Sequence, residues 1–134
     1  MDGERNLDML LNTMQPLLMD GKWVFRTSVN GFDVATLETA ILMFREPEGV
    51  TIISPATQCE CDEGLPRWAM ITLSIHSDLE AVGFLAAITT SLAAIGIPVN
   101  AVSAYYHDHI FVPYERRDDA LECLRCMMRE TNCD

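Results

Sequence analysis

The sequence predicts an α+β protein made of two small sandwiches, each combining an antiparallel sheet with helices. The chain has 134 residues, of which 49% are hydrophobic, and this is enough for a core in one compact unit or two small lobes. Residues 55–66 are polar, acidic and bounded by prolines, as is typical of a linker. Strand and helix patterns alternate on both sides of it. We therefore expect an N-terminal lobe at residues 1–66 and a C-terminal domain at residues 67–134.

The first predicted element is a short amphipathic helix near the N-terminus. Its apolar residues recur at three-and-four spacing: Leu7, Leu10, Leu11, Met14, Leu17 and Leu18. The turn pair Asp20-Gly21 stops the pattern, and Pro16 bends or ends the helix earlier.

Three strands are predicted next. Residues 22–29 (KWVFRTSV) are rich in aromatic and β-branched side chains and precede the turn pair Asn30-Gly31. Residues 41–45 and 50–54 flank a four-residue loop that contains proline and glycine. These last two strands should form a hairpin.

The second half opens with a predicted strand at residues 68–75. The polar residues 76–78 that follow can cap the start of a helix, which runs to Ile95. Gly96 stands where a left-handed C-terminal cap is wanted, and Pro98 bars continuation of the helix.

Residues 98–106 and 109–115 predict two more strands, joined by a two-residue turn at His107-Asp108, and residues 118–130 predict a final helix. The inward face of that helix would consist of Ala120, Leu121, Leu124, Met127 and Met128. The order strand, helix, strand, strand, helix is most of a ferredoxin-like βαββαβ sandwich. One strand is missing, so some other segment must complete the sheet.

A weak internal duplication accompanies this pattern. Residues 22–27 (KWVFRT) resemble residues 67–72 (RWAMIT) at an offset of 45 positions. Two related lobes could share strands or join their sheets edge to edge, which would cover edges that otherwise invite aggregation. A homodimer could cover them in the same way.

The charge balance excludes two classes of partner. Acidic residues outnumber basic ones 20 to 9, giving a formal charge of −11, and such a surface repels nucleic-acid phosphates and anionic lipid headgroups. We therefore expect binding neither to nucleic acid nor to membranes. The sequence holds no uninterrupted apolar stretch of the length that a membrane-spanning helix needs, and the acidic start MDGERNLD is unlike a secretory signal. We expect a cytoplasmic protein.

The cysteines fit that compartment. Cys59, Cys61, Cys123, Cys126 and Cys133 cannot all pair within one chain, and a reducing environment keeps them as thiols. The first four could offer thiolates to zinc, but one pair has a single intervening residue and the other lies within a predicted helix. We interpret them as packed or incidental thiols and expect no metal site there.

Residues 83–97 (GFLAAITTSLAAIGI) resemble the first helix of an ACT domain, in which a glycine and two apolar residues open a helix that ends in Gly-Ile. Residues 70–83 and the string YYHDHIFVP at residues 105–113 are similar to an uncharacterised bacterial group of small tandem ACT proteins. The N-terminal halves of those proteins also resemble residues 7–53. The resemblance spans nearly the whole chain, and the second half carries most of its specificity.

This resemblance implies a regulatory module that binds a small ligand, usually an amino acid, between adjoining ACT units. In the family the ligand lies at the turn between the first strand and first helix. The matching residues here are His76, Ser77, Asp78, Leu79, Gly83 and Phe84. A helix N-terminus offers free N–H groups to an α-carboxylate, and an acid such as Asp78 can receive the ammonium group. Asn100, His107 and His109 are further candidates.

We therefore expect a non-catalytic sensor of an amino acid that works as a homodimer, without cofactor or metal. The sequence shows no P-loop, dinucleotide fingerprint or nucleophile elbow. Two alternatives remain open. His107, Asp108 and His109, with His76, could form a metal site or a small active centre. The protein could also be an adaptor that binds another protein and no ligand.

Overall fold

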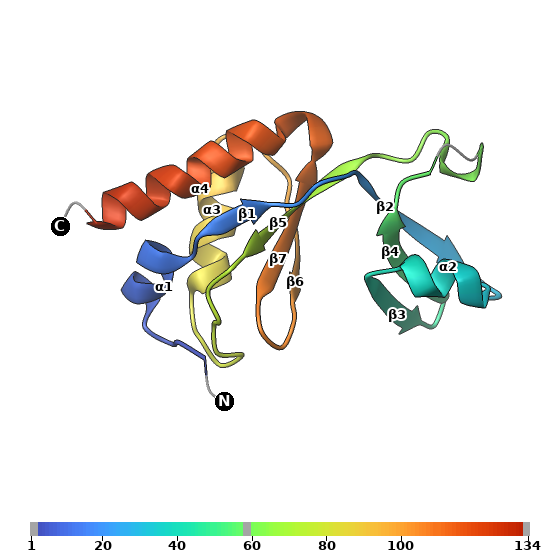
Figure 1. The fold of residues 1–134 in the computed structure, drawn as a ribbon, viewed down its shortest axis with the longest axis horizontal. Coiled ribbons are helices and arrows are strands. Elements are labelled where there is room, and N and C mark those ends of the chain that lie inside the picture. Colours follow the sequence, from blue (N-terminus) through green and yellow to red (C-terminus); the bar gives the residue numbers. More distant parts are fainter. Residues whose placement is uncertain (1–2, 58–59, 133–134) are drawn as a thin grey trace. The chain divides into compact units, whose positions relative to one another are not determined.

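Helices and strands alternate along the chain in the computed structural model, which describes residues 3–57 and 60–132 (Figure 1). The elements in chain order are α1 (Leu7–Thr13), β1 (Pro16–Leu18), β2 (Trp23–Ser28), α2 (Val34–Thr39), β3 (Leu42–Glu46), β4 (Gly49–Pro55), the 3-10 helix η1 (Glu60–Asp62), β5 (Trp68–Leu73), α3 (Phe84–Ala94), β6 (Asn100–Ser103), β7 (Asp108–Pro113), the 3-10 helix η2 (Tyr114–Arg116) and α4 (Arg117–Asn132). They form two compact units. Unit 1 contains the described residues up to Asp20 and from Ala69 onward, and unit 2 runs from Gly21 to Trp68.

This division differs from the expected boundary between residues 66 and 67. The first 20 residues belong to the same compact unit as the C-terminal half. The physical reason is burial, since Leu10 and Met14 are both 0% exposed within the core of unit 1. The amphipathic face near the N-terminus therefore packs on α4 and α3, which are distant in sequence.

β1 supplies the strand that the sequence pattern left missing. It pairs antiparallel with β5, Pro16 opposite Leu73 and Leu18 opposite Ile71, and the sheet of unit 1 has the order β1-β5-β7-β6. The apolar spacing extends to Leu18, but α1 ends at Thr13, in agreement with the early end expected from Pro16. Pro16 disfavours a helical conformation in the residue before it, and Gln15 has φ +44°.

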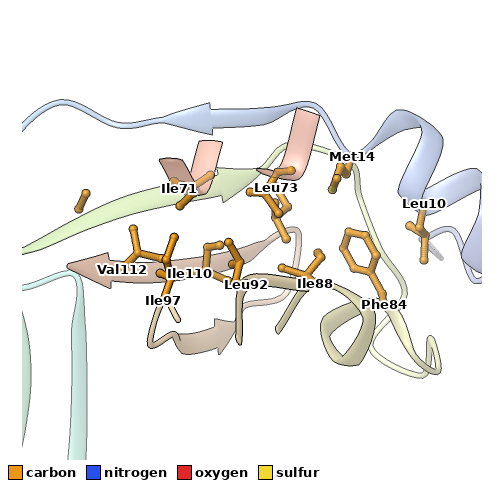
Figure 2. Packing of buried hydrophobic residues seen from close by; sticks show 13 residues of the cluster. Leu10, Met14, Ile71, Leu73, Phe84, Ile88, Leu92, Ile97, Ile110 and Val112 are labelled. Carbon is orange, nitrogen blue, oxygen red and sulfur yellow. The ribbon is translucent and has the colours of Figure 1, made fainter. Parts of the chain in front are cut away.

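The core of unit 1 lies between this sheet and its helices. Ile71 and Leu73 of β5, with Ile110 and Val112 of β7, face Ile88 and Leu92 of α3 (Figure 2). Phe84 and α1 close one end of this layer, and Ala120 and Leu124 of α4 complete the cluster. Alternate residues of each strand point to the core, as expected for a sheet covered by helices on this face.

Two further boundaries differ from the prediction and affect the site. The residues at 76–78 do not cap a helix, because α3 begins only at Phe84, after Gly83 with φ +89°. The hairpin between β6 and β7 turns at residues 104–107, where the Ala104 N–H donates to the His107 carbonyl at 3.0 Å. Asp108 is therefore a strand residue paired with Ser103, not a turn residue. The predicted cap at Gly96 is confirmed by its φ of +77°.

Unit 2 contains the predicted strands and one helix that the sequence analysis missed. β2 pairs with β4 and β4 pairs with β3, all antiparallel, and Trp23 is paired with Trp68. α2 lies between β2 and β3 and is capped by Asp33, whose side chain accepts from the Thr36 N–H. Six residues with two threonines and a valine carry too little periodic pattern to predict a helix.

Candidate functional site

The loop that joins β5 to α3 is held by the N-terminal segment of the chain. Glu4 forms an isolated parallel bridge with Ser77. The Glu4 N–H donates to the His76 carbonyl at 2.8 Å, and the Asp78 N–H donates to the Glu4 carbonyl at 2.9 Å. Residues 3–6, which we call the strap, therefore lie along this loop like a short additional strand.

Gly3 allows the strap to approach the loop closely. A Cβ atom at this position would lie 2.6 Å from the Asp78 nitrogen and from the Ser77 carbonyl carbon, and 2.7 Å from the His76 oxygen. These atoms belong to the backbone, so no flexible side chain can move aside to make room. Any residue larger than glycine would push the strap away from the loop.

Arg5 connects the strap to two acidic side chains of the loop. Its Nε lies 3.1 Å from Asp78 Oδ2, and its Nη2 lies 2.8 Å from Glu80 Oε2. The Glu80 N–H also donates to Asp78 Oδ1 at 2.7 Å. This N–H and the Arg5 guanidinium hold the pKa of Asp78 below its ordinary value. Asp78 is therefore ionised at neutral pH.

Ser77 and Asp108 form a buried polar pair in the same region. Each residue is only 6% exposed, and Ser77 Oγ donates to Asp108 Oδ2 at 2.9 Å. Asp108 alternates with Ile110 and Val112 along β7, so its side chain lies on the helix-covered face of the sheet. The hydroxyl of Ser77 thus fixes a carboxylate beside the start of α3.

The N-terminus of α3 opens into a hollow next to this pair. No side chain in the described part of the chain caps the helix at Gly83. The first turn of a helix carries unpaired N–H groups and a partial positive charge. The hollow has a volume of about 130 Å³, and its lining residues are Ser77, Asp78, Leu79, Ala81, Gly83, Phe84, Leu85, Ala86, Ser103 and Asp108.

A second hollow, of about 260 Å³, lies on the strap side of the same loop and shares Asp78 and Leu79 with the first. The full lining is Gly3, Arg5, His76, Asp78, Leu79, Glu80 and Tyr105. The ring of His76 lies 5.5 Å from that of Tyr106, which lies 5.0 Å from that of Tyr105. The loop therefore separates two hollows that offer carboxylates, one guanidinium and aromatic rings.

Six of the nine predicted ligand residues gather here. Ser77, Asp78, Leu79, Gly83 and Phe84 line the first hollow, and His76 lines the second. Asn100 lines neither, because it stands opposite Phe111 at the other end of β6 from Ser103. That these residues bind a ligand stays a prediction.

His107 and His109 also line neither of these hollows. Thr72 Oγ1 lies 2.9 Å from His109 Nδ1, and His109 alternates with the core-facing Asp108 and Ile110, so it is on the opposite face of the sheet. The rings of His107 and His109 are 6.3 Å apart. Burial, and then the neighbouring His107, lower the pKa of His109. Among residues 3–57 and 60–132 no three histidine, cysteine or acidic side chains are arranged to hold a metal ion.

The sequence analysis missed several lining residues, above all Gly3 and Arg5 of the strap. They are more than 70 positions away from the loop, and nothing in their local pattern points to it. Ser103 and Tyr105 belong to the β6–β7 hairpin and become neighbours of the loop only through the sheet. Glu80 could have been found, because it follows Asp78 by two positions in a polar loop.

None of the described cysteines lines either hollow. Cys123 and Cys126 are half-buried free thiols, and burial raises the pKa of Cys123, which opposes thiolate chemistry. Cys61 is exposed, and the interpretation of Cys59 and Cys133 concerns positions outside the described residues. No described helix combines the length and the apolar character needed to cross a bilayer.

Comparisons with known proteins agree with this architecture. ACT-domain models match residues 2–66 and residues 65–126. Protein VC0802 from Vibrio cholerae, described as of unknown function and a possible transport protein, is 45% identical, with 88% of this chain and 92% of that chain covered and a TM-score of 0.76. No curated protein sequence matches the chain.

Two more distant structures share the fold. Protein Atu0741 from Agobacterium tumefaciens is 14% identical, with coverage of 84% and 87% and a TM-score of 0.70. A structure of the aspartokinase alpha and beta subunits is 11% identical, with coverage of 85% and 97% and a TM-score of 0.60. At these identities the likeness concerns the fold alone. With the two family matches and the close relative, the chain belongs to the ACT-domain family and carries two ACT domains in tandem.

Proposed function

We propose that this protein is a non-catalytic regulatory module that binds a free amino acid at the N-terminus of α3. Membership of the ACT-domain family supports a regulatory role. The observation that carries the proposal is the hollow at this helix end, which lacks a side-chain cap within the described chain and is lined by Asp78 and Asp108.

The hollow suits both charged groups of an amino acid. The free N–H groups and the positive end of the α3 dipole favour an α-carboxylate. Asp78 and Asp108 belong to the same lining and favour an α-ammonium group. A volume of about 130 Å³ is open on one side, so a side chain of the ligand can extend outward past Leu79.

Regulation requires that the ligand bind one state of the protein more tightly than another. A homodimer provides such states. β6 is the last strand of the sheet order, and Asn100, Ala101 and Ser103 on it are exposed. Pairing of β6 with its copy in a second chain would cover this edge. We expect sedimentation velocity to give a dimer that Ala101→Pro weakens, because proline cannot pair in a continuous sheet.

Thermal melting with each common L-amino acid tests the proposed function. A ligand present at a hundred times its Kd should stabilise the folded chain by about 2.7 kcal/mol. Stabilisation by one amino acid or a small related group would support the proposal. If none of them shifts the melting temperature or binds by calorimetry, the chain is not an amino-acid sensor of this kind and the adaptor alternative gains.

A variant separates binding from folding. Ala86→Glu places a carboxylate in the first turn of α3, inside the lining of the hollow, where it satisfies the helix dipole and stabilises the helix by about 0.3–1 kcal/mol. It should nevertheless reduce affinity at least tenfold, because it competes with the ligand carboxylate. Thr90→Glu, on an exposed position in the middle of α3, is the matched control and should bind normally.

A further inference from the structure

We infer that the strap, residues 3–6, is an autoinhibitory segment, such that its seating on the loop and the binding of an amino acid exclude each other. This inference rests on the proposed function and adds the regulation of the same site. The strap and the proposed amino-acid ligand share one residue, Asp78.

The strap already occupies the polar groups that a ligand would need at Asp78. The Glu4 carbonyl accepts the Asp78 N–H, and the Arg5 guanidinium lies against the Asp78 and Glu80 carboxylates. Arg5 is thus a tethered cation on Asp78 Oδ2, a carboxylate oxygen that the ammonium group of a ligand would also use. Withdrawal of Arg5 would free this oxygen for an ammonium group.

The strap can be released without unfolding unit 1. Its four residues, Gly-Glu-Arg-Asn, contain no apolar side chain, so polar contacts hold it on the loop. The side chains of Arg5 and Glu80 are 59% and 75% exposed, so their ion pair contributes little, whereas Asp78, the other partner of Arg5, is 9% exposed. The chain becomes firmly anchored only in α1, where Leu10 is completely buried. Asn6 belongs to this anchor, because its side chain accepts from the Met9 N–H and caps α1. Residues 3–5 of the strap can therefore detach while α1 stays in the core.

Gly3 makes the seated state sensitive to substitution. A Cβ atom there would lie within 2.7 Å of three backbone atoms of the loop. Gly3→Val should therefore unseat the strap while it keeps every charged group of the site. Arg5→Gln removes the tethered cation and leaves the glycine contact, so the two variants disturb the strap in independent ways.

The experiment measures amino-acid affinity by calorimetry for the full chain and for Gly3→Val, Arg5→Gln and Arg129→Gln. Arg129 is the matched control, because its side chain is as exposed as that of Arg5, at 59%. It forms an ion pair with Glu122 within α4, away from the strap. If the strap is seated about nine-tenths of the time, unseating it should tighten binding about tenfold, because apparent affinity scales with the competent fraction. The control should bind like the unaltered chain.

Hydrogen exchange of the Glu4 amide gives a direct readout of the strap, because this N–H is bonded to the loop at His76. We expect exchange to speed up at least tenfold in Gly3→Val and, in the unaltered chain, when a bound amino acid is added. If the strap had only a structural role, a bound amino acid would not speed up hydrogen exchange of the Glu4 amide.

The outcomes separate the two proposals. Binding that is tighter in both strap variants, or detectable only in them, supports autoinhibition and the sensor function together. Binding that is equal or weaker in the strap variants overturns autoinhibition and leaves the sensor function standing. Absence of binding in every variant overturns both.

Discussion

At the scale of single residues, the buried hydrogen bond between Ser77 and Asp108 is the contact of the candidate site whose loss should affect stability most. Both residues are 6% exposed, so neither can exchange its partner for bulk water. Ser77→Ala should cost about 1–3 kcal/mol in free energy of unfolding, because the Asp108 carboxylate loses its hydroxyl donor. Urea denaturation measures this loss. Ser103→Ala is the control, since Ser103 is exposed and stands opposite Asp108 in the β6–β7 hairpin. It should change the free energy of unfolding by less than about 0.5 kcal/mol.

His109 provides a prediction about pH. Burial, followed by His107, lowers its pKa below the ordinary value of about 6.5. The unfolded chain therefore binds a proton more readily than the folded chain, and the contribution of His109 to stability is lost as the pH falls below about 6.5. NMR titration of the ring should give a midpoint below 6.5. A midpoint at or above 6.5 would contradict the half-buried position beside Thr72.

At the scale of elements, a buried ion pair fixes the segment after β4 onto β2 in unit 2. Asp62 is fully buried, and it accepts from Arg26 Nε at 2.8 Å, from Arg26 Nη2 at 2.7 Å and from the Thr57 N–H at 2.6 Å. Burial by itself raises the pKa of Asp62, but Arg26 and Thr57 outweigh it and lower the pKa to about 2.

The sign of this shift predicts how unit 2 responds to acid. A carboxylate whose pKa is lower in the folded than in the unfolded chain stabilises the folded state. For Asp62 this stabilisation is complete above the unfolded pKa of about 3.9, and it is lost as the pH falls toward the folded pKa of about 2. Arg26→Met should destabilise the chain at pH 7, by about 3 kcal/mol, because Asp62 stays buried without its counter-ion. It should also remove much of the acid dependence between pH 4 and 2, as measured by circular dichroism of Arg26→Met beside the unaltered chain.

α1 is an element whose partner the sequence did not reveal. Leu10 is 0% exposed in the core of unit 1, among side chains of β5 and α3. Leu10→Ala should therefore cost about 2–5 kcal/mol. Leu17→Ala, which alters a side chain 54% exposed on β1, serves as the control and should cost much less in the same thermal melts.

At the scale of the whole molecule, the two compact units do not follow the order of the sequence, because unit 1 contains residues from both ends of the chain. A chain of residues 67–134 alone lacks β1 and α1, so β5 loses an edge partner and the core loses Leu10 and Met14. We expect this fragment not to melt cooperatively. Met19 and Met70 are hydrogen-bonded neighbours, 2.9 Å from nitrogen to oxygen, so a short Gly-Ser linker can replace residues 21–68. That shortened chain should fold, and calorimetry distinguishes the two results.

Local patterns were enough for most elements because each depends on nearby residues. The strands at residues 41–45 and 50–54 with their hairpin, the cap at Gly96 and the final helix follow from side-chain alternation, turn residues and apolar spacing. The loop after β5 was predicted as the ligand site from its resemblance to ACT domains, and six of the nine predicted ligand residues do meet around two hollows. Whether they bind a ligand is decided by the experiments above.

The features that local patterns did not predict depend on which side chains the folded sheet buries. The sequence by itself determined the fold class and the family and pointed to the loop of the candidate site, because these depend on local spacing and on recognisable motifs. Only the tertiary structure joined residues 3–20 to the C-terminal half, turned His109 away from Asp108 and brought Arg5 to Asp78. Such contacts join residues that are far apart along the chain or fix which face of a strand a side chain occupies, and no local pattern carries that information.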